Sequence, residues 1–251
     1  MAPIIGFSGA PAGGGGGWTP ASASSLFFWF KSDTGVLAAG GGAASNTDPV
    51  ATWQDQSGNG HHLTQTVSAN RPVFETGILN SLPGVHFLSQ TPNASFMSNA
   101  DAVTQNQPFF IMVVLKTASN TTAINLPTIF DNPAGSGNRP RMFLNNGFTD
   151  GFCCLETSTG GTQDLTTGVA AANSTAYYFY GGFNGASSIV RFSSGTEQSG
   201  SQKADALNTF QFSNDGATPY WGYLLEMFCI PSWTGTDKTN AISYVQTRYG
   251  L

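Results

Sequence analysis

Apolar residues gather in short runs, which polar and glycine-rich segments separate. The longest run, Phe109 to Leu115, lies within segment 108–118 and contains β-branched residues, as in a strand buried on both faces. Asn-Gly, Asp-Gly and Gly-Gly pairs between many runs are typical of turns. The other predicted strands are 25–31, 85–88, 128–132, 141–147, 152–158, 177–183, 188–195, 209–215 and 222–230. Many short strands with no helices between them predict an all-β, two-sheet antiparallel sandwich or jelly roll.

At the end of the chain the apolar positions recur with a different period. Apolar residues recur there at helical spacing, at Ala241, Ile242, Val245 and Tyr249. Thr236 or Asp237 is the expected N-terminal cap, and Gly250 is the expected C-terminal cap. Arg248 falls in the last turn, where the helix dipole favours a cation. We therefore expect one short C-terminal helix that packs its apolar stripe on the sandwich.

The chain divides into a short arm and one domain. Residues 1–20 include GAPAGGGGG, which has almost no side chains to bury and predicts a flexible Gly/Ala/Pro-rich arm. Residues 21–251 show no repeat and no second shift in composition, so we predict a single jelly-roll domain there.

Charge excludes two classes of partner. Charged residues make up only 9% of the chain, and the formal net charge is −5. The nine Lys and Arg residues form no basic stripe, which argues against nucleic acid and against an anionic membrane surface. The three cysteines form no even-numbered disulfide framework, and we interpret them as small buried residues.

The segment WQDQSGNGHHL, residues 53–63, concentrates polar chemistry. Asp55, Ser57 and Asn59 alternate, so Asp55 and Asn59 are candidate calcium ligands, and we expect no cofactor other than this calcium. His61 and His62 are adjacent and would diverge in a strand, which disfavours zinc. The alternative is a structural corner in which Gly58 and Gly60 supply positive φ, with Trp53 in the core. That corner comprises Trp53, Asp55, Ser57, Gly58, Asn59 and Gly60.

The order of these segments resembles a known family. LFFWFKSDTGV, WQDQSGNGHHLTQ, RPVF and LNSLPGVHF, followed by GYLLEMFCI and a terminal helix ending in RYGL, are similar to laminin-G-like jelly rolls of the concanavalin A-like lectin/glucanase superfamily. The resemblance spans residues 25–251 and implies two packed antiparallel sheets. It implies no single function, because this sandwich carries lectins, glycosidases, adhesins and structural modules.

Catalytic motifs are missing from the sequence. The glucanase branch of this superfamily carries paired acids in E-x-D-x-x-E, whereas Glu226 stands alone in its strand and we interpret it as structural. Asp205, Asp215 and Glu197 lie on separate predicted loops. No Gly-x-Ser-x-Gly elbow is present, and His86 is interpreted as a satisfied strand residue. We therefore expect no catalytic residues and no enzymatic activity.

Exposed aromatic side chains are candidates for sugar contacts. Tyr220, Trp221 and Trp233 lie within two residues of Pro or Gly and are predicted to bind carbohydrate from rim loops. Asn138, Asn145, Asn146 and Asp150 are polar residues of the type that accompanies such aromatics.

The layout favours a non-enzymatic virion protein. The N-terminus lacks the basic n-region and apolar core of a Sec signal peptide, and similar domains with Gly-rich arms occur in phage decoration, fibre and tail proteins. We therefore predict a structural or surface-display protein of a virion, extracellular after release. Its expected partners are other virion proteins, further copies of itself in a homo-oligomer, and surface glycans. The alternatives are a polysaccharide-acting glycoside hydrolase of the glucanase kind and a soluble lectin.

Overall fold

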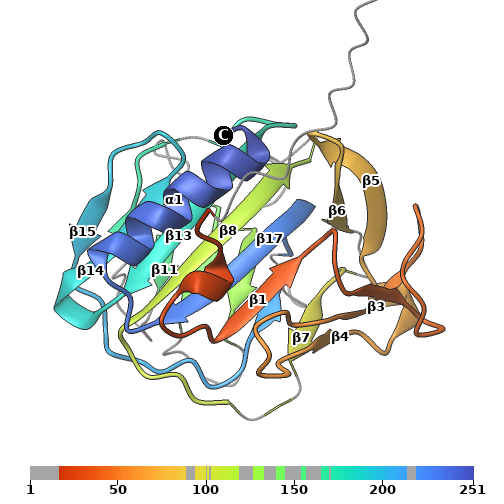
Figure 1. Ribbon diagram of the computed structural model, residues 1–251, viewed down its shortest axis with the longest axis horizontal. Coiled ribbons are helices and arrows are strands. Elements are labelled where there is room, and N and C mark those ends of the chain that lie inside the picture. The colour runs from red at the N-terminus through yellow and green to blue at the C-terminus, as the bar shows by residue number, and fades with distance from the viewer. Residues whose placement is uncertain are drawn as a thin grey trace, which may run out of the picture.

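The computed structural model describes most of the domain. It covers residues 17–88, 94–99, 101, 103–118, 127–132, 140–144, 154–156, 165–169, 171–213 and 219–251, with only the backbone described at 154–156. Two antiparallel β-sheets pack face to face, and a single α-helix lies across the outer face of one of them (Figure 1). The predicted all-β two-sheet sandwich with a C-terminal helix is therefore confirmed.

Sheet A carries the helix. Its strand order among the described residues is β15-β14-β13-β8-β17-β6-β5, and β1 also pairs with β17. The strands are β1 (Phe28–Lys31), β5 (Val73–Leu79), β6 (Leu82–Phe87), β8 (Phe109–Thr117), β13 (Ala176–Phe183), β14 (Ser188–Phe192), β15 (Gln198–Gly200) and β17 (Gly222–Pro231).

Sheet B forms the opposite layer. Its order in the described part of the chain is β12-β11-β10-β9-β16-β7-β4-β3-β2. The strands are β2 (Val36–Ala38), β3 (Val50–Trp53), β4 (Leu63–Thr64), β7 (Met97–Asn99), β9 (Thr128–Asp131), β10 (Arg141–Phe143), β11 (Cys154–Glu156), β12 (Leu165–Thr166) and β16 (Gln211–Phe212). Short 3-10 turns connect several strands: η1 (Pro20–Ser22), η2 (Ser68–Asn70) and η4 (Gly185–Ser187).

Strand β8 explains why its sequence is continuously apolar. Its side chains alternate between two cores, because successive residues of a strand point to opposite faces. Phe109, Ile111, Val113 and Leu115 enter the core between the two sheets. Phe110, Met112 and Val114 enter a second core between sheet A and the helix. The prediction of a strand buried on both faces is confirmed.

Helix α1 (Gly235–Tyr249) covers the second core with Ala241, Val245 and Tyr249. The predicted cap at Thr236 or Asp237 is wrong. Thr234 is the N-cap, and Asp237 is the third helical residue, whose carboxylate accepts from the Thr234 amide in a reciprocal capping box. Gly250 ends the helix at φ 67°, as predicted.

The N-terminal segment meets the helix before β1 begins. The ring of Trp18 lies 6.1 Å from that of Tyr244 and 6.4 Å from that of Phe228, so residue 18 packs with the domain. Residues 1–16 of the predicted arm lie outside the described residues. No helix in the described part of the chain has the length and apolar character needed to cross a bilayer.

Candidate functional site

The 53–63 segment forms a corner that Asp55 organises. Trp53 is fully buried at the end of β3. One Asp55 carboxylate oxygen accepts from the backbone amides of Trp29 (2.8 Å) and Ser57 (2.9 Å). The other accepts from the Ser57 hydroxyl (2.6 Å) and the His61 amide (3.1 Å). These bonds tie the loop to itself and to the adjacent strand β1.

The rest of the corner supports the same geometry. The Asn59 side-chain amide donates to the carbonyls of Leu26 (2.6 Å) and Phe27 (3.0 Å). Gly58 and Gly60 have φ of 90° and 79°, a region that glycine adopts without strain.

The hydrogen-bond donors around Asp55 also affect whether the corner can bind a calcium ion. A calcium ion needs several oxygen ligands, but both Asp55 oxygens already accept from N–H and O–H groups, and the Asn59 amide nitrogen is engaged as a donor. Carboxylate and amide oxygens keep further lone pairs beside these bonds, so calcium binding at Asp55 and Asn59 stays a prediction. Among the described residues, no group of three or more His, Cys, Asp or Glu side chains could hold a metal ion.

The three aromatic residues predicted to contact sugar lie in different surroundings. Tyr220 is fully buried and its hydroxyl donates to the Lys116 carbonyl (3.0 Å), so its ring presents no face to a ligand. Trp221 and Trp233 are half-buried, and the ring of Trp233 packs 5.6 Å from that of Phe110. Sugar contacts by these two tryptophans stay predictions. The accompanying residues Asn138, Asn145, Asn146 and Asp150 lie outside the described residues.

Glu226 is a buried acid beneath α1. Its carboxylate accepts from the Trp29 indole (2.6 Å) and from the hydroxyls of Tyr244 (2.9 Å) and Tyr249 (2.7 Å), and lies 3.2 Å from the Arg248 guanidinium. Burial raises the pKa of Glu226, although these donors and Arg248 oppose the shift. Its partners join β1, β17 and α1, so the group holds the helix on sheet A.

A second polar cluster lies on the β5–β6 side of sheet A. His86 stacks on Tyr223 with ring centroids 4.2 Å apart, and its Nδ1 lies 2.6 Å from Glu75. The Tyr223 hydroxyl donates to the same carboxylate (3.0 Å), and burial followed by this bond raises the pKa of Tyr223 to about 12. These mutual contacts give the cluster a structural role.

Sheet B aligns a row of polar side chains, which we call the polar row. Strand register pairs Thr52 with Thr64, Thr64 with Ser98, Ser98 with Gln211, and Gln211 with Asp131. Their strand neighbours Trp53, Leu63, Met97 and Phe212 enter the core between the sheets, so the polar row faces outward. Five adjacent strands span roughly 19 Å at about 4.8 Å per spacing.

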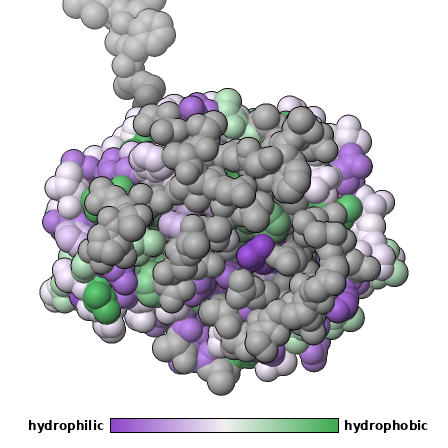
Figure 2. Space-filling model, turned by 180° about the vertical axis from the view of Figure 1, so that it is seen from behind, coloured by the Kyte–Doolittle hydropathy of each residue, from purple (hydrophilic) through white to green (hydrophobic). Residues whose placement is uncertain are grey.

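Access differs along the polar row. Thr52, Thr64 and Ser98 are partly exposed, whereas Gln211 is 4% exposed and Asp131 is fully buried. Figure 2 views the molecule from the side opposite α1, where sheet B lies and hydrophilic residues reach the surface. Each of these strands has only two to four residues and contributes one position, so the sequence shows no alternating pattern that would indicate this row.

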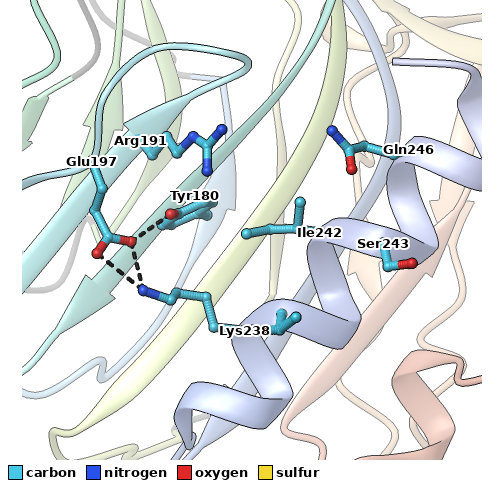
Figure 3. Close-up of a pocket in the computed structure, with 8 residues that line it drawn as sticks. Tyr180, Arg191, Glu197, Lys238, Ile242, Ser243 and Gln246 are labelled. Carbon is cyan, nitrogen blue, oxygen red and sulfur yellow. Dashed lines mark hydrogen bonds and ion pairs between the residues drawn. The ribbon is translucent and has the colours of Figure 1, made fainter.

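A pocket of about 440 Å³ lies between α1 and the outer face of sheet A (Figure 3). Helix α1 contributes one face, and Tyr180 of β13 and Arg191 of β14 are directly paired in the sheet. Glu197 reaches in from the turn before β15. The residues that line it are Tyr180, Arg191, Glu197, Lys238, Thr239, Ile242, Ser243 and Gln246.

An ion pair closes one end of the pocket. Lys238 donates to both oxygens of Glu197 (2.8 and 3.0 Å), and the Tyr180 hydroxyl donates to the same carboxylate. Burial, with Glu197 adding to it, raises the pKa of Tyr180, so its hydroxyl stays protonated. The sequence predicts Glu197 on a separate loop, and no local motif indicates its partners, which lie 17 and 41 residues away.

Comparison with solved structures identifies the fold class. Domain 4 of AbnA, a GH43 extracellular arabinanase from Geobacillus stearothermophilus, in complex with arabinotriose, is 12% identical with a TM-score of 0.60, over 87% of this chain and 98% of that one. A GH54 α-L-arabinofuranosidase is 14% identical with a TM-score of 0.58, over 90% of this chain and 59% of that one.

A Trypanosoma rangeli sialidase in complex with 2,3-difluorosialic acid is 10% identical with a TM-score of 0.51, over 98% of this chain and 36% of that one. This chain therefore spans about three-fifths of the arabinofuranosidase and about a third of the sialidase. The sequence matches no protein-family model and no curated protein. Identities this low show a shared β-sandwich fold.

These comparisons correct the functional hypothesis. The predicted non-enzymatic virion protein is contradicted, because the three solved structures compared above are glycoside hydrolases or a domain of one. The expectation of no enzymatic activity is contradicted on the same ground. A Gly-rich arm and low charge are properties that many protein classes share, so they do not by themselves indicate a virion protein.

Proposed function

We propose that this protein acts on glycans. The observation that carries the proposal is the fold shared over 98% of an arabinanase domain that was solved with arabinotriose. The arabinofuranosidase of similar fold supports the same substrate class, oligosaccharides that contain arabinose.

We assign the sugar chain to the polar row on the outer face of sheet B. Hydroxyl and amide groups, as in Thr52, Thr64, Ser98 and Gln211, donate and accept hydrogen bonds and therefore suit the hydroxyls of neutral sugars. The partly exposed end, from Thr52 to Ser98, receives the ligand first.

Hydrolysis makes a further chemical demand. Glycoside hydrolysis normally uses two carboxyl groups that flank the scissile bond. Asp131 is the carboxyl group that the described polar row contributes, and it is fully buried. Binding and hydrolysis therefore need separate measurements on the same protein.

The test titrates arabinotriose, xylotriose and cellotriose by calorimetry and assays linear arabinan for new reducing ends. We expect saturable binding of arabinotriose. Ser98→Tyr places a large ring across the polar row and should weaken that binding at least about 10-fold, the scale of one to two lost hydrogen bonds. Ser199→Tyr is the matched control, because Ser199 is exposed on strand β15 of the other sheet.

Two results would overturn the proposal. One is the absence of both binding and reducing-end release with every glycan tested. The other is unchanged arabinotriose affinity in folded Ser98→Tyr, which would remove the polar row as the site.

A further inference from the structure

The pocket between α1 and sheet A contains a cation that the fold does not neutralise. Arg191 anchors its guanidinium through Nε, which donates to the Ser193 carbonyl (2.9 Å). Among the described residues, Arg191 has no ion-pair partner. The guanidinium also interacts with the Tyr180 hydroxyl, and no carboxylate of the described residues forms an ion pair with it.

The other charges of the pocket cancel. Lys238 and Glu197 form an ion pair at one end, and the Tyr180 hydroxyl is neutral. The described lining residues therefore carry a net charge of +1, from Arg191, in a protein whose formal net charge is −5. A local positive charge on an acidic protein favours a small monoanion over a large polyanion.

Uncharged groups complete the lining. Figure 3 shows Arg191 and Gln246 extending toward one another from opposite walls, with the Ile242 side chain between the walls. The Gln246 amide supplies a donor and an acceptor, and Ile242 supplies an apolar contact. The volume, about 440 Å³, lies in the range of small-molecule sites.

We propose that this pocket binds a carboxylate-bearing small ligand of the uronic acid class. The Arg191 guanidinium receives the carboxylate, because its planar fork matches the two oxygens. The Gln246 amide meets the ligand's hydroxyl groups, and the Thr239 hydroxyl, which donates to the Gly235 carbonyl, accepts from them. Its single negative charge equals the one unneutralised positive charge, whereas a phosphate dianion would exceed it.

This site is independent of the proposed glycan row. The pocket lies on the outer face of sheet A and the polar row on the outer face of sheet B. Either assignment can therefore fail alone, and different probes test them.

The experiment titrates the full chain with D-galacturonate, with D-galactose as the neutral match and with inorganic phosphate, by calorimetry at fixed ionic strength. We expect saturable galacturonate binding that exceeds galactose and phosphate binding at least about 10-fold, the scale of a charge-assisted hydrogen bond. Arg191→Met should abolish this preference over galactose.

Arg71→Met is the matched control. Arg71 donates to the carbonyls of Gln65 and Thr66, in a segment that contributes nothing to the pocket lining. Its galacturonate affinity should equal that of the wild type, with folding of both variants verified by thermal melting.

A second variant tests the contribution of α1, which forms the wall of the pocket opposite Arg191. Gln246→Ala should weaken galacturonate binding about 3- to 10-fold, because one neutral hydrogen bond is lost. The proposal is overturned if galacturonate shows no saturable binding, if galactose or phosphate binds as tightly, or if folded Arg191→Met binds galacturonate as the wild type does.

Discussion

Asp55 and Glu226 are both buried carboxylates surrounded by donors, but their donors come from different parts of the chain. Asp55 is bound mainly by the corner that contains it, through Ser57 and His61, and by one amide of β1. Glu226 is bound by side chains of β1 and α1 that lie 18 to 197 residues away.

The difference separates two uses of a buried acid. Backbone amides around Asp55 fix the path of a turn, which is a local task. Indole, phenol and guanidinium groups around Glu226 join layers that are distant in sequence. The first arrangement is readable from a short motif, and the second requires the tertiary structure.

The largest expected effect is that of Asp55→Ala. It removes four hydrogen bonds and leaves the Trp29 and Ser57 amides without their acceptor, which should cost roughly 3–5 kcal/mol of unfolding free energy. Urea denaturation measures the change. A loss below about 0.5 kcal/mol, typical of an ordinary surface substitution, would contradict the structural corner.

Glu226→Ala should cost somewhat less, roughly 2–4 kcal/mol, because removing a desolvated charge offsets part of the lost bonding. The loss should concentrate in α1, whose amides would exchange faster with deuterium than those of β8. Tyr249→Phe is the milder control, since it removes one donor from the same carboxylate. Unchanged exchange in α1 would show that Glu226 does not hold the helix.

The pH dependence of the unfolding free energy tests the burial of Glu226. Because burial raises the pKa of Glu226, its ionisation costs free energy in the folded state. Its contribution is therefore greatest at acid pH and falls as pH rises through the raised pKa. The unfolding free energy of the wild type minus that of Glu226→Gln should decrease from pH 4 to pH 8. A difference that is constant or increases over this range would refute the assigned shift.

The smallest effect is expected for Gly58→Ala in the corner. A Cβ there would meet no atom within 4 Å, so the cost arises only from φ 90° and should be about 1 kcal/mol. Gly42→Ala is the control, because its Cβ would also meet nothing and its φ is not positive. Equal stability of the two variants in urea denaturation would show that the positive φ at position 58 does not require glycine.

Local patterns predicted much of the fold. The apolar run of β8, the helical spacing of α1 and the Gly250 cap all follow from residues close in sequence. The helix start was misplaced because several capping residues stand together, and the reciprocal bonds of Thr234 and Asp237 decide among them. Tyr220 looked like a surface aromatic beside Pro219, but it inserts beneath β8 and β17.

The sequence by itself determined the two-sheet sandwich, the terminal helix and the 53–63 corner, because alternation, helical period and turn chemistry act over a few residues. Tertiary structure decided the polar row, the Glu226 cluster and the pocket around Arg191. Strand register aligns single residues from five strands in the polar row, and sheet order brings residues 180–197 beneath residues 238–246. Such contacts depend on which strands pair and where the helix docks, and no short segment of the sequence determines either.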